Sequence, residues 1–256
     1  MAPDIAQQLW DARHDGRTVS ADALGVIADY TAAYALQTAV TTLSGAVVIG
    51  WKLGATSAAS QKVFGLRGPF YGPLLAPFCH ATGTTVTGAA AFGPGAEGEF
   101  ALTMASALPP RDAPYVEDDV AAAVASVCPA IEIAGTRLAG GLLKADPRHL
   151  IADDAANIAF IPGDHVSDWR ATDLADHKIT LMINGIEKAT GTGALALGGP
   201  LTALTWFANT LCEQGRGLAA GEIITTGTCT GFVPLRPGDH VVVDCGPLGK
   251  ASATIT

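Results

Sequence analysis

The sequence predicts an α+β protein in which a small helical N-terminal lobe precedes a mixed, largely antiparallel β-roll or β-sandwich core. The first 45 residues carry apolar side chains at helical spacing. Residues 222–255 instead form short strand-like segments with no helix between them, which is typical of an antiparallel or mixed sheet. A chain of 256 residues with 49% hydrophobic and 15% charged content can also bury a large core. We therefore expect a helical lobe at residues 1–45 and a mixed β domain at residues 46–256.

Charge and composition exclude several classes of partner. The net charge is −9 and the 15 Lys and Arg residues form no cluster, so neither a nucleic acid nor an anionic membrane is an expected partner. No apolar run approaches the ~20 residues that a membrane-spanning helix requires. The five cysteines are odd in number and lack a Cys-x-x-Cys motif, which favours a reducing compartment. Because the N-terminus also lacks the features of a secretory signal, we expect a cytoplasmic protein.

The N-terminal lobe is predicted to contain two helices. Ile5, Leu9 and Trp10 lie at helical spacing in the first helix, and Ser20 is the expected N-cap of the second, which runs toward residue 44. No functional motif is visible in this lobe.

A predicted strand at residues 46–57 places a single lysine between two glycines. Gly50, Lys52 and Gly54 share one face of this strand, and glycines beside a lone lysine often mark the close approach of a ligand. The alternative is a lysine that extends from the strand edge into solvent. Ser57 is the expected N-cap of a short helix at residues 58–64, and residues 68–73, which include Tyr71, are expected to form an aromatic turn.

Two acidic side chains share one face of the strand predicted at residues 95–102. Glu97 and Glu99 point to the same side, while Phe100 and Leu102 point to the other. A solvated strand face explains such a pair when it is considered alone. A third carboxylate favours a different explanation.

Glu132 lies within a short apolar strand at residues 128–134, between Ala130 and Ala134. A lone buried carboxylate is costly unless a cation or a hydrogen bond satisfies it. If Glu97, Glu99 and Glu132 converge, they form an all-oxygen site for a hard divalent cation, Mg²⁺ or Mn²⁺. The histidines and cysteines are dispersed and lack the spacing of zinc ligands, so a zinc site is not expected.

The remaining elements complete the predicted sheet. A helix is expected at residues 117–127, a hairpin at residues 178–188 with its turn at Asn184 and Gly185, and a helix at residues 200–214. Residues 140–147 form either a mobile cover over the site or a plain surface loop.

Six short motifs follow one another along nearly the whole chain, at residues 50–57, 97–99, 132, 226–228, 237–239 and 246–249. In this order they resemble the fumarylacetoacetate hydrolase superfamily, and more narrowly its 2-keto-4-pentenoate hydratase and 4-oxalocrotonate decarboxylase branch.

The resemblance implies a fumarylacetoacetase C-terminal-like fold around Mg²⁺ bound by three glutamates, which by motif are Glu97, Glu99 and Glu132. Lys52 matches the active-site lysine of the family. The substrates implied are 2-keto or 2-hydroxy-dienoic acids, whose carboxylate and 2-oxygen chelate one cation. The cation then stabilises an enolate in either hydration or decarboxylation. Thr228 and the backbone of Gly227 are expected to hold a substrate oxygen.

This sequence departs from the family pattern in several places. Hydratases of the branch often carry an acidic residue in the turn that spans residues 69–72 here, and none is present in this sequence. We therefore expect the base that activates water to be Asp153 or Asp154, with Tyr71 and Asn157 as further substrate-binding residues. No histidine has a Glu three residues later, so C–C hydrolysis is the least favoured of the three chemistries.

The resulting hypothesis is a Mg²⁺-dependent lyase of aromatic ring-cleavage catabolism, with 2-keto-4-pentenoate hydratase as the main interpretation. The alternatives are a 4-oxalocrotonate decarboxylase, or a non-catalytic accessory subunit of such an enzyme pair. We expect a small-molecule 2-keto acid as substrate and a homo-oligomer as the assembly. Association with a related hydratase or decarboxylase is a further expectation from the resemblance.

Overall fold

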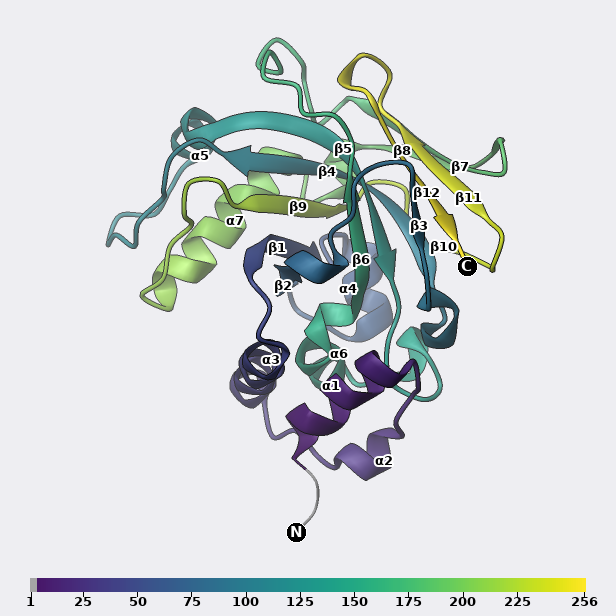
Figure 1. The fold of residues 1–256 in the computed structure, drawn as a ribbon. Coiled ribbons are helices and arrows are strands. Elements are labelled where there is room, and N and C mark those ends of the chain that lie inside the picture. The colour runs from purple at the N-terminus through teal and green to yellow at the C-terminus, as the bar shows by residue number, and fades with distance from the viewer. Residues whose placement is uncertain (1–3) are drawn as a thin grey trace.

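The computed structural model describes residues 4–256 and contains two curled β-sheets with helices packed at their margins (Figure 1). The helices are α1 (Ile5–Asp15), α2 (Ala21–Leu24), α3 (Tyr30–Ser44), α4 (Ala58–Phe64), α5 (Glu117–Ala123), α6 (Pro147–Ala152) and α7 (Pro200–Glu213). The strands are β1 (Val48–Gly54), β2 (Phe70–Leu75), β3 (Thr84–Val86), β4 (Gly95–Met104), β5 (Val124–Ala134), β6 (Asn157–Pro162), β7 (Lys178–Ile183), β8 (Ile186–Thr192), β9 (Ile223–Thr228), β10 (Val233–Pro234), β11 (His240–Asp244) and β12 (Lys250–Ile255). The expected mixed, largely antiparallel architecture is confirmed.

The larger sheet has the strand order β2-β1-β9-β4-β5-β6, with β10 paired to β4. The smaller sheet has the order β3-β12-β11-β7-β8. Only the pairs β1·β9 and β3·β12 are parallel among the described strand pairs. The two sheets enclose one large apolar cluster that includes Phe100, Leu102 and Ile131 from the larger sheet and Val241 and Val243 from the smaller one.

The N-terminal helices lie at the lower end of the molecule in Figure 1, together with α6. Their buried side chains form a second apolar cluster, in which Leu9 and Val40 of the lobe join Leu150 and Ile151 of α6. The lobe therefore shares its core with a segment more than a hundred residues away in sequence. The division of the chain at residue 45 stays a prediction.

Several predicted elements are confirmed. Ser57 caps α4 and Gly65 ends it, and the hairpin β7–β8 turns at Asn184 and Gly185. The helix expected near residues 200–214 is α7.

Three local predictions were wrong. The predicted second helix is interrupted: α2 ends at Gly25, which has a left-handed φ of 77°, and Asp29 caps α3 as a separate helix. Residues 70–75 form β2 rather than a turn, because pairing with β1 overrides the Gly and Pro signals; Pro73 is tolerated on this edge strand. The helix α5 ends at Ala123, after which β-branched residues continue as β5.

The central strands β4 and β5 bring the predicted acidic residues together. Their antiparallel register pairs Glu97 with Glu132 and Glu99 with Ala130. On its other side β4 pairs with β9, which in turn lies next to β1 and therefore near Lys52. Four strands, β1, β4, β5 and β9, thus meet around one point of the larger sheet.

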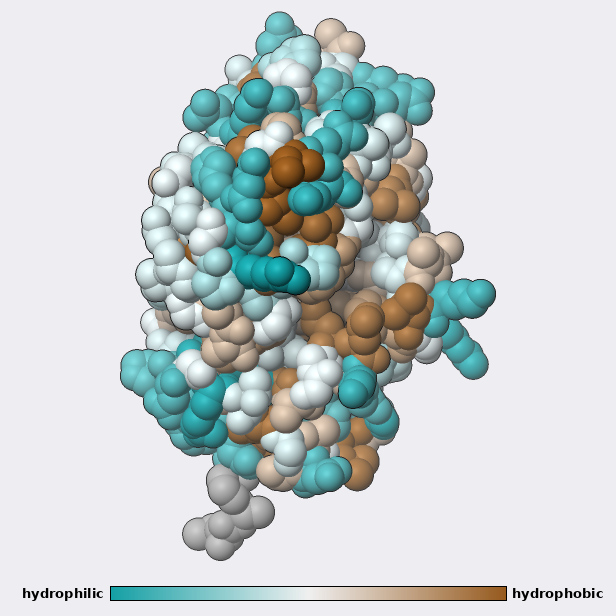
Figure 2. All heavy atoms as spheres, turned by 90° about the vertical axis from the view of Figure 1, so that its right-hand side faces the viewer, coloured by the Kyte–Doolittle hydropathy of each residue, from teal (hydrophilic) through white to brown (hydrophobic). Residues whose placement is uncertain are grey.

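Exposed large hydrophobic side chains are scattered over the described surface. Figure 2 shows one face on which hydrophilic residues predominate and separate hydrophobic patches interrupt them, some of them bordering a hollow. Among residues 4–256, no helix combines the length and apolar character needed to cross a membrane.

The close approach of β1 and β9 generates a test of the sheet order. A Cβ atom at Gly50 would lie 1.9 Å from the carbonyl oxygen of Ile223, so we expect Gly50→Ala to push the two strands apart. Overpacking of this kind costs about 1–3 kcal/mol of unfolding free energy, measured by urea denaturation. Gly68→Ala is the matched control, because no atom lies within 4 Å of its added Cβ. Equal stability of both variants would contradict the β1·β9 pairing.

Candidate metal centre and active site

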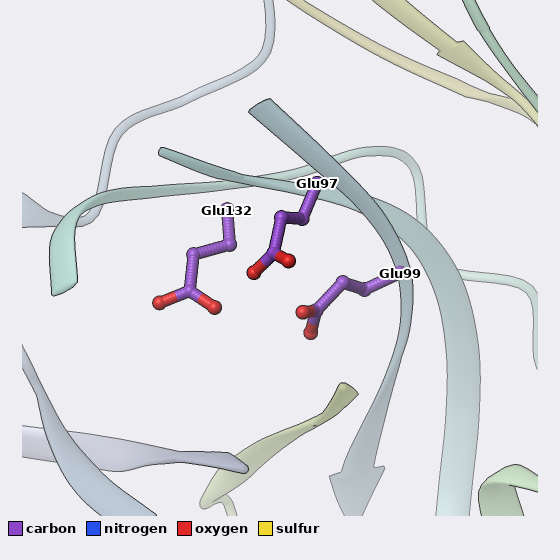
Figure 3. A group of neighbouring side chains, drawn as sticks. All are labelled: Glu97, Glu99 and Glu132. Atoms are coloured by element: carbon purple, nitrogen blue, oxygen red, sulfur yellow. The ribbon is translucent and has the colours of Figure 1, made fainter. Parts of the chain in front are cut away.

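Three carboxylates converge on one point of the larger sheet (Figure 3). Glu97 and Glu99 project from the same face of β4, and Glu132 projects beside them from β5. One oxygen from each side chain can be chosen so that all three lie within 4.8 Å of one another. The structure therefore brings together the three residues that the sequence predicted as metal ligands.

The cluster is buried and electrostatically unfavourable by itself. Glu99 and Glu132 are fully buried, and Glu97 is half-buried. Burial, followed by the neighbouring carboxylate of Glu132, raises the pKa of Glu97 to about 7. The same two causes, with Glu97 added, hold the pKa of Glu99 well above its usual range. The folded chain thus retains negative charge here only against a substantial penalty.

Two observations show that the cluster fits a divalent cation. Glu99 Oε1 and Glu132 Oε2 are buried and have no hydrogen-bond partner in the described structure. When ionised, the three carboxylates together with the ammonium of Lys52 leave two negative charges uncompensated. An all-oxygen donor set with this charge suits a hard divalent cation such as Mg²⁺ or Mn²⁺.

The end of β9 fixes the orientation of Glu99. The hydroxyl of Thr225 donates a hydrogen bond to Glu99 Oε2, and the backbone N–H of Gly227 donates to the same oxygen at 3.1 Å. Gly227 has a left-handed φ of 99°, and a Cβ atom there would lie 2.0 Å from Oγ1 of Thr56. Only glycine fits this position. Because both donors bind Oε2 of Glu99, its Oε1 has no hydrogen-bond partner and is free to bind a metal ion.

Lys52 reaches the cluster from β1. Its Nζ lies 3.1 Å from Glu132 Oε1 and donates to the carbonyl oxygen of Ala155 at 2.9 Å. Burial alone favours the neutral amine, but the carboxylates of Glu132, Glu97 and Glu99 outweigh it and raise the pKa of Lys52. The buried lysine is therefore a cation, and the alternative of a side chain that extends into solvent is excluded.

Asn157 orients the third carboxylate. Its Nδ2 donates to Glu132 Oε1 at 3.0 Å, so this oxygen is shared by Asn157 and Lys52 while Oε2 remains free. Asn157 follows three consecutive non-glycine residues with left-handed φ values, Asp154 (53°), Ala155 (50°) and Ala156 (64°). Each such residue costs on the order of 1–3 kcal/mol unless its surroundings enforce the conformation.

A cavity of about 370 Å³ opens beside the cluster. Its polar lining includes Lys52, Glu97 and Thr228. Lys52 and Glu97 are the titratable groups among the described residues that line it. The other walls are mostly apolar, with Phe64, Phe70, Leu142, Leu143 and Phe232 among them. The cavity therefore suits a small ligand with a charged end and an apolar remainder.

Asp153 and Asp154 do not line this cavity. Asp153 is buried in an ion pair with Arg137 and also accepts from the hydroxyl of Thr136. Asp154 pairs with Arg13 at 2.8 Å, and burial, which outweighs this pair, raises the pKa of Asp154 to about 6. The role of general base for either residue stays a prediction, which these buried ion pairs disfavour.

Tyr71 also lies away from the cavity, because side chains alternate along β2. Phe70 faces the cavity, whereas Tyr71 stacks on Tyr34 and donates to Gln214 at 2.7 Å. Substrate binding by Tyr71 stays a prediction that this orientation disfavours. The alternation would have pointed to Phe70 had residues 70–75 been recognised as a strand.

Sequence reasoning also missed Thr225, Ala155 and Arg13. The side chain of Thr225 on β9 points to the same face of the sheet as Glu99 on β4. The two-residue alternation of a strand would predict this once the pairing of β9 with β4 is known. The carbonyl group of Ala155 carries no sequence signal. Arg13 lies in a helix without any recognisable motif, 141 residues from its partner Asp154.

The segment at residues 140–147 contributes to the cavity wall. Leu142 and Leu143 line the cavity, and the side chain of Leu143 is 78% exposed. That this segment moves as a cover stays a prediction.

Comparison with known proteins gives the site a family context. The family model described as fumarylacetoacetate (FAA) hydrolase C-terminal matches residues 79–256. The 4-oxalocrotonate decarboxylase of Pseudomonas putida is 32% identical over 206 residues, which cover 80% of this chain and 76% of the relative. The 2-keto-4-pentenoate hydratase of Burkholderia vietnamiensis is 30% identical over 257 residues, covering 98% and 96%. The 2-keto-4-pentenoate hydratase 2 of Dechloromonas aromatica is 32% identical, covering 99% and 97%.

A solved structure agrees with the fold over almost the whole chain. The 4-oxalocrotonate decarboxylase from Pseudomonas putida G7, complexed with magnesium and adipate, superposes with a TM-score of 0.89 at 29% identity and covers 98% of this chain and 96% of that one. The same enzyme has been solved with calcium and acetate and gives a TM-score of 0.87. The resemblance seen in the sequence is confirmed: this chain belongs to the fumarylacetoacetate hydrolase family.

Proposed function

We propose that this chain is a Mg²⁺- or Mn²⁺-dependent lyase that acts on 2-keto or 2-hydroxy-dienoic acids from aromatic ring cleavage, with hydration of 2-keto-4-pentenoate as its main reaction. The observation that carries the proposal is the convergence of Glu97, Glu99 and Glu132 opposite the buried Lys52 at a small cavity. The relatives named as hydratases, which match this chain along nearly its full length, support the choice of reaction.

Glu97, Glu99 and Glu132 would hold the cation. When bound, it would supply Lewis-acid stabilisation of negative charge on the 2-oxygen of the substrate. The chain contributes the rigidity of the ligands: Thr225 and Gly227 fix one oxygen of Glu99, while Asn157 and Lys52 fix one oxygen of Glu132. Held in this way, each carboxylate presents its other oxygen without rearrangement.

Lys52 would pair with the substrate carboxylate or transfer protons during the reaction. Its raised pKa keeps the amine protonated at neutral pH, which favours the first role. Thr228 lines the cavity and offers a hydroxyl to a substrate oxygen, while the N–H of Gly227 already donates to Glu99. We therefore assign substrate binding to Lys52 and Thr228, and ligand positioning to Gly227.

Proton transfer at the carbon chain needs a group inside the cavity. Glu97 is the one carboxylate among the described residues that line the cavity, but it is assigned to the cation, which would lower the pKa that burial raises. It is therefore not free to serve as the base while the cation is bound. Asp153 and Asp154 would act there only if their ion pairs with Arg137 and Arg13 opened.

Decarboxylation of 4-oxalocrotonate is the second candidate reaction. The walls away from Lys52 and Glu97 carry apolar side chains and the hydroxyls of Ser57 and Ser60, with no carboxylate or imidazole among the described lining residues. Hydration needs a base to activate water at that end of the substrate, whereas loss of CO₂ needs none. This absence is the observation that favours decarboxylation.

A homo-oligomer, a cytoplasmic location and association with a related hydratase or decarboxylase remain proposals drawn from the family resemblance and the composition. The complete set of three carboxylates and Lys52 argues against a non-catalytic accessory subunit.

The two reactions are separated by assaying two substrates with and without Mg²⁺. We expect Mg²⁺-dependent water addition to 2-hydroxypenta-2,4-dienoate, followed as loss of its ultraviolet absorbance. If the protein released CO₂ from the 5-carboxylated analogue and added no water to 2-hydroxypenta-2,4-dienoate, its reaction would be decarboxylation and not hydration. Inactivity toward both compounds with Mg²⁺ and with Mn²⁺ would contradict the proposed function.

Removal of one predicted ligand should abolish tight metal binding. In Glu132→Gln the free Oε2 becomes part of a neutral amide, so we expect the Mg²⁺ Kd of metal-stripped protein to rise by about 10-fold or more in calorimetric titration. Glu187→Gln, at an exposed position on β8, is the matched control and should bind as the parent does. A Glu132→Gln variant with parental affinity would show that the cation binds elsewhere.

The metal-free protein should become more stable as the pH falls through neutrality. Because the folded-state pKa values of Glu97 and Glu99 are raised, the native state binds more protons than the unfolded state between their ordinary range and about 7. Their contribution to the unfolding free energy therefore grows as the pH falls toward 5 and is lost as it rises through about 7. The melting temperature of the double variant Glu97→Gln, Glu99→Gln should not show this rise as the pH falls. If the melting temperatures of the parent and the double variant changed with pH in the same way, the prediction would be refuted.

A further inference from the structure

We propose that Arg13, contributed by α1, is a positioning residue for the metal centre: it holds residues 154–158 in the conformation that presents Ala155 to Lys52 and Asn157 to Glu132. This inference rests on the proposed function, because it adds a positioning residue to the metal site on which that function depends. Arg13 does not line the cavity and touches none of the three carboxylates, so it acts through the segment alone.

The segment makes two contacts that shape the site. The carbonyl oxygen of Ala155 accepts from Lys52 Nζ, which fixes the amine against Glu132. Two residues later, Asn157 donates to the same oxygen of Glu132. A displacement of this backbone would therefore move both groups that orient Glu132: the ammonium group of Lys52 and the side-chain amide of Asn157.

The conformation of the segment is one that its residues do not favour. Asp154, Ala155 and Ala156 all have left-handed φ values, although none of them is glycine. Such a run persists only when contacts from outside the segment enforce it. The structure must therefore contain groups that hold this backbone in place.

Arg13 supplies these contacts from the N-terminal lobe. Its Nη1 donates to Asp154 Oδ2 at 2.8 Å and to the carbonyl oxygen of Asn157 at 3.0 Å, and its Nη2 donates to the carbonyl oxygen of Ile158 at 2.9 Å. The side chain is 5% exposed, and its guanidinium carbon lies 3.6 Å from the ring centroid of Phe78. One planar group thus bonds one end of the left-handed run and the two carbonyls that follow it.

Arg137 also holds the segment, through Asp153, which precedes it, and through one of its carbonyl groups. Its Nε pairs with Asp153 Oδ1 at 2.5 Å and its Nη1 donates to the carbonyl oxygen of Asn157 at 2.6 Å. The carbonyl of Asn157 therefore accepts from both arginines. Arg137 lies close to Asp153 in sequence, whereas Arg13 is the one contact in this set that comes from the N-terminal lobe.

The decisive variant removes the buried pair without leaving an unpaired charge. In Arg13→Met, Asp154→Asn both members are neutral, so lost activity cannot be attributed to an isolated buried carboxylate. We expect the Mg²⁺ Kd, measured by calorimetry without substrate, to rise by about 5-fold or more, and kcat to fall by about 10-fold or more, at a temperature where the variant is fully folded. Arg13→Lys, which keeps the charge but loses the planar fork, should give an intermediate loss even if the double variant fails to fold.

The matched control is Arg17→Met, Asp15→Asn. This pair also joins an arginine to an aspartate in the N-terminal lobe, at 3.2 Å, but makes no contact with residues 154–158 among its described bonds. It should leave the Kd and kcat of the parent unchanged.

A glycine rescue distinguishes positioning from general stability. Ala156→Gly removes the Cβ that makes φ near 64° unfavourable, so its addition to Arg13→Met, Asp154→Asn should restore about 3-fold or more of the lost Mg²⁺ affinity. Parental Kd and kcat in the neutral pair, with only a lower melting temperature, would show that Arg13 is merely structural and would overturn the proposal.

The crystal structure of the metal-free neutral pair tests the inference separately from the proposed function. Loss of the hydrogen bond between Lys52 and Ala155 supports positioning by Arg13 even if the parent binds no Mg²⁺, a result that would defeat the proposed function alone. An unchanged segment in that structure would defeat the inference and leave the proposed function intact.

Discussion

The site depends on an excess of buried negative charge. Three carboxylates converge where strands β4 and β5 pair, and a single ammonium, that of Lys52, faces them. Glu97 and Glu132 are even direct cross-strand partners, an arrangement in which like charges destabilise a sheet. The fold tolerates this arrangement because hydrogen bonds from β9 and Asn157 fix the orientation of Glu99 and Glu132. Burial and mutual repulsion raise the pKa values of Glu97 and Glu99, and a bound cation would relieve this repulsion.

The architecture divides labour between the two sheets and the helical lobe. The larger sheet supplies the three carboxylates and the described groups that pair or hydrogen-bond with them, through β1, β4, β5, β9 and the start of β6. The smaller sheet closes the core from the other side through residues such as Val241 and Val243. The N-terminal lobe reaches the site indirectly, through the ion pair between Arg13 and Asp154.

The acidic cluster was predictable mainly because Glu132 breaks a local pattern. Glu97 and Glu99 share a strand face by the period of two, and Glu132 interrupts an apolar strand, so their chemistry was visible before their proximity was. Tyr71 and Phe70 show the limit of this approach: a Gly and Pro signal suggested a turn, and the pairing with β1 that makes the segment a strand is a tertiary effect. Asp153 and Asp154 show a second limit, since their partners Arg137 and Arg13 lie in segments whose approach no local pattern encodes.

The insertion of β9 between β1 and β4 has a consequence for the chain during its synthesis. Thr225 lies 126 residues after Glu99, so β1 and β4 are both made long before the strand that joins them emerges from the ribosome. Each of them presents an unpaired edge during that interval, and open edges associate readily with other strands. The nascent chain thus carries these open edges until the segment that contains β9 emerges. The residues that orient Glu99 arrive with the same segment, so the carboxylate cluster becomes complete only then.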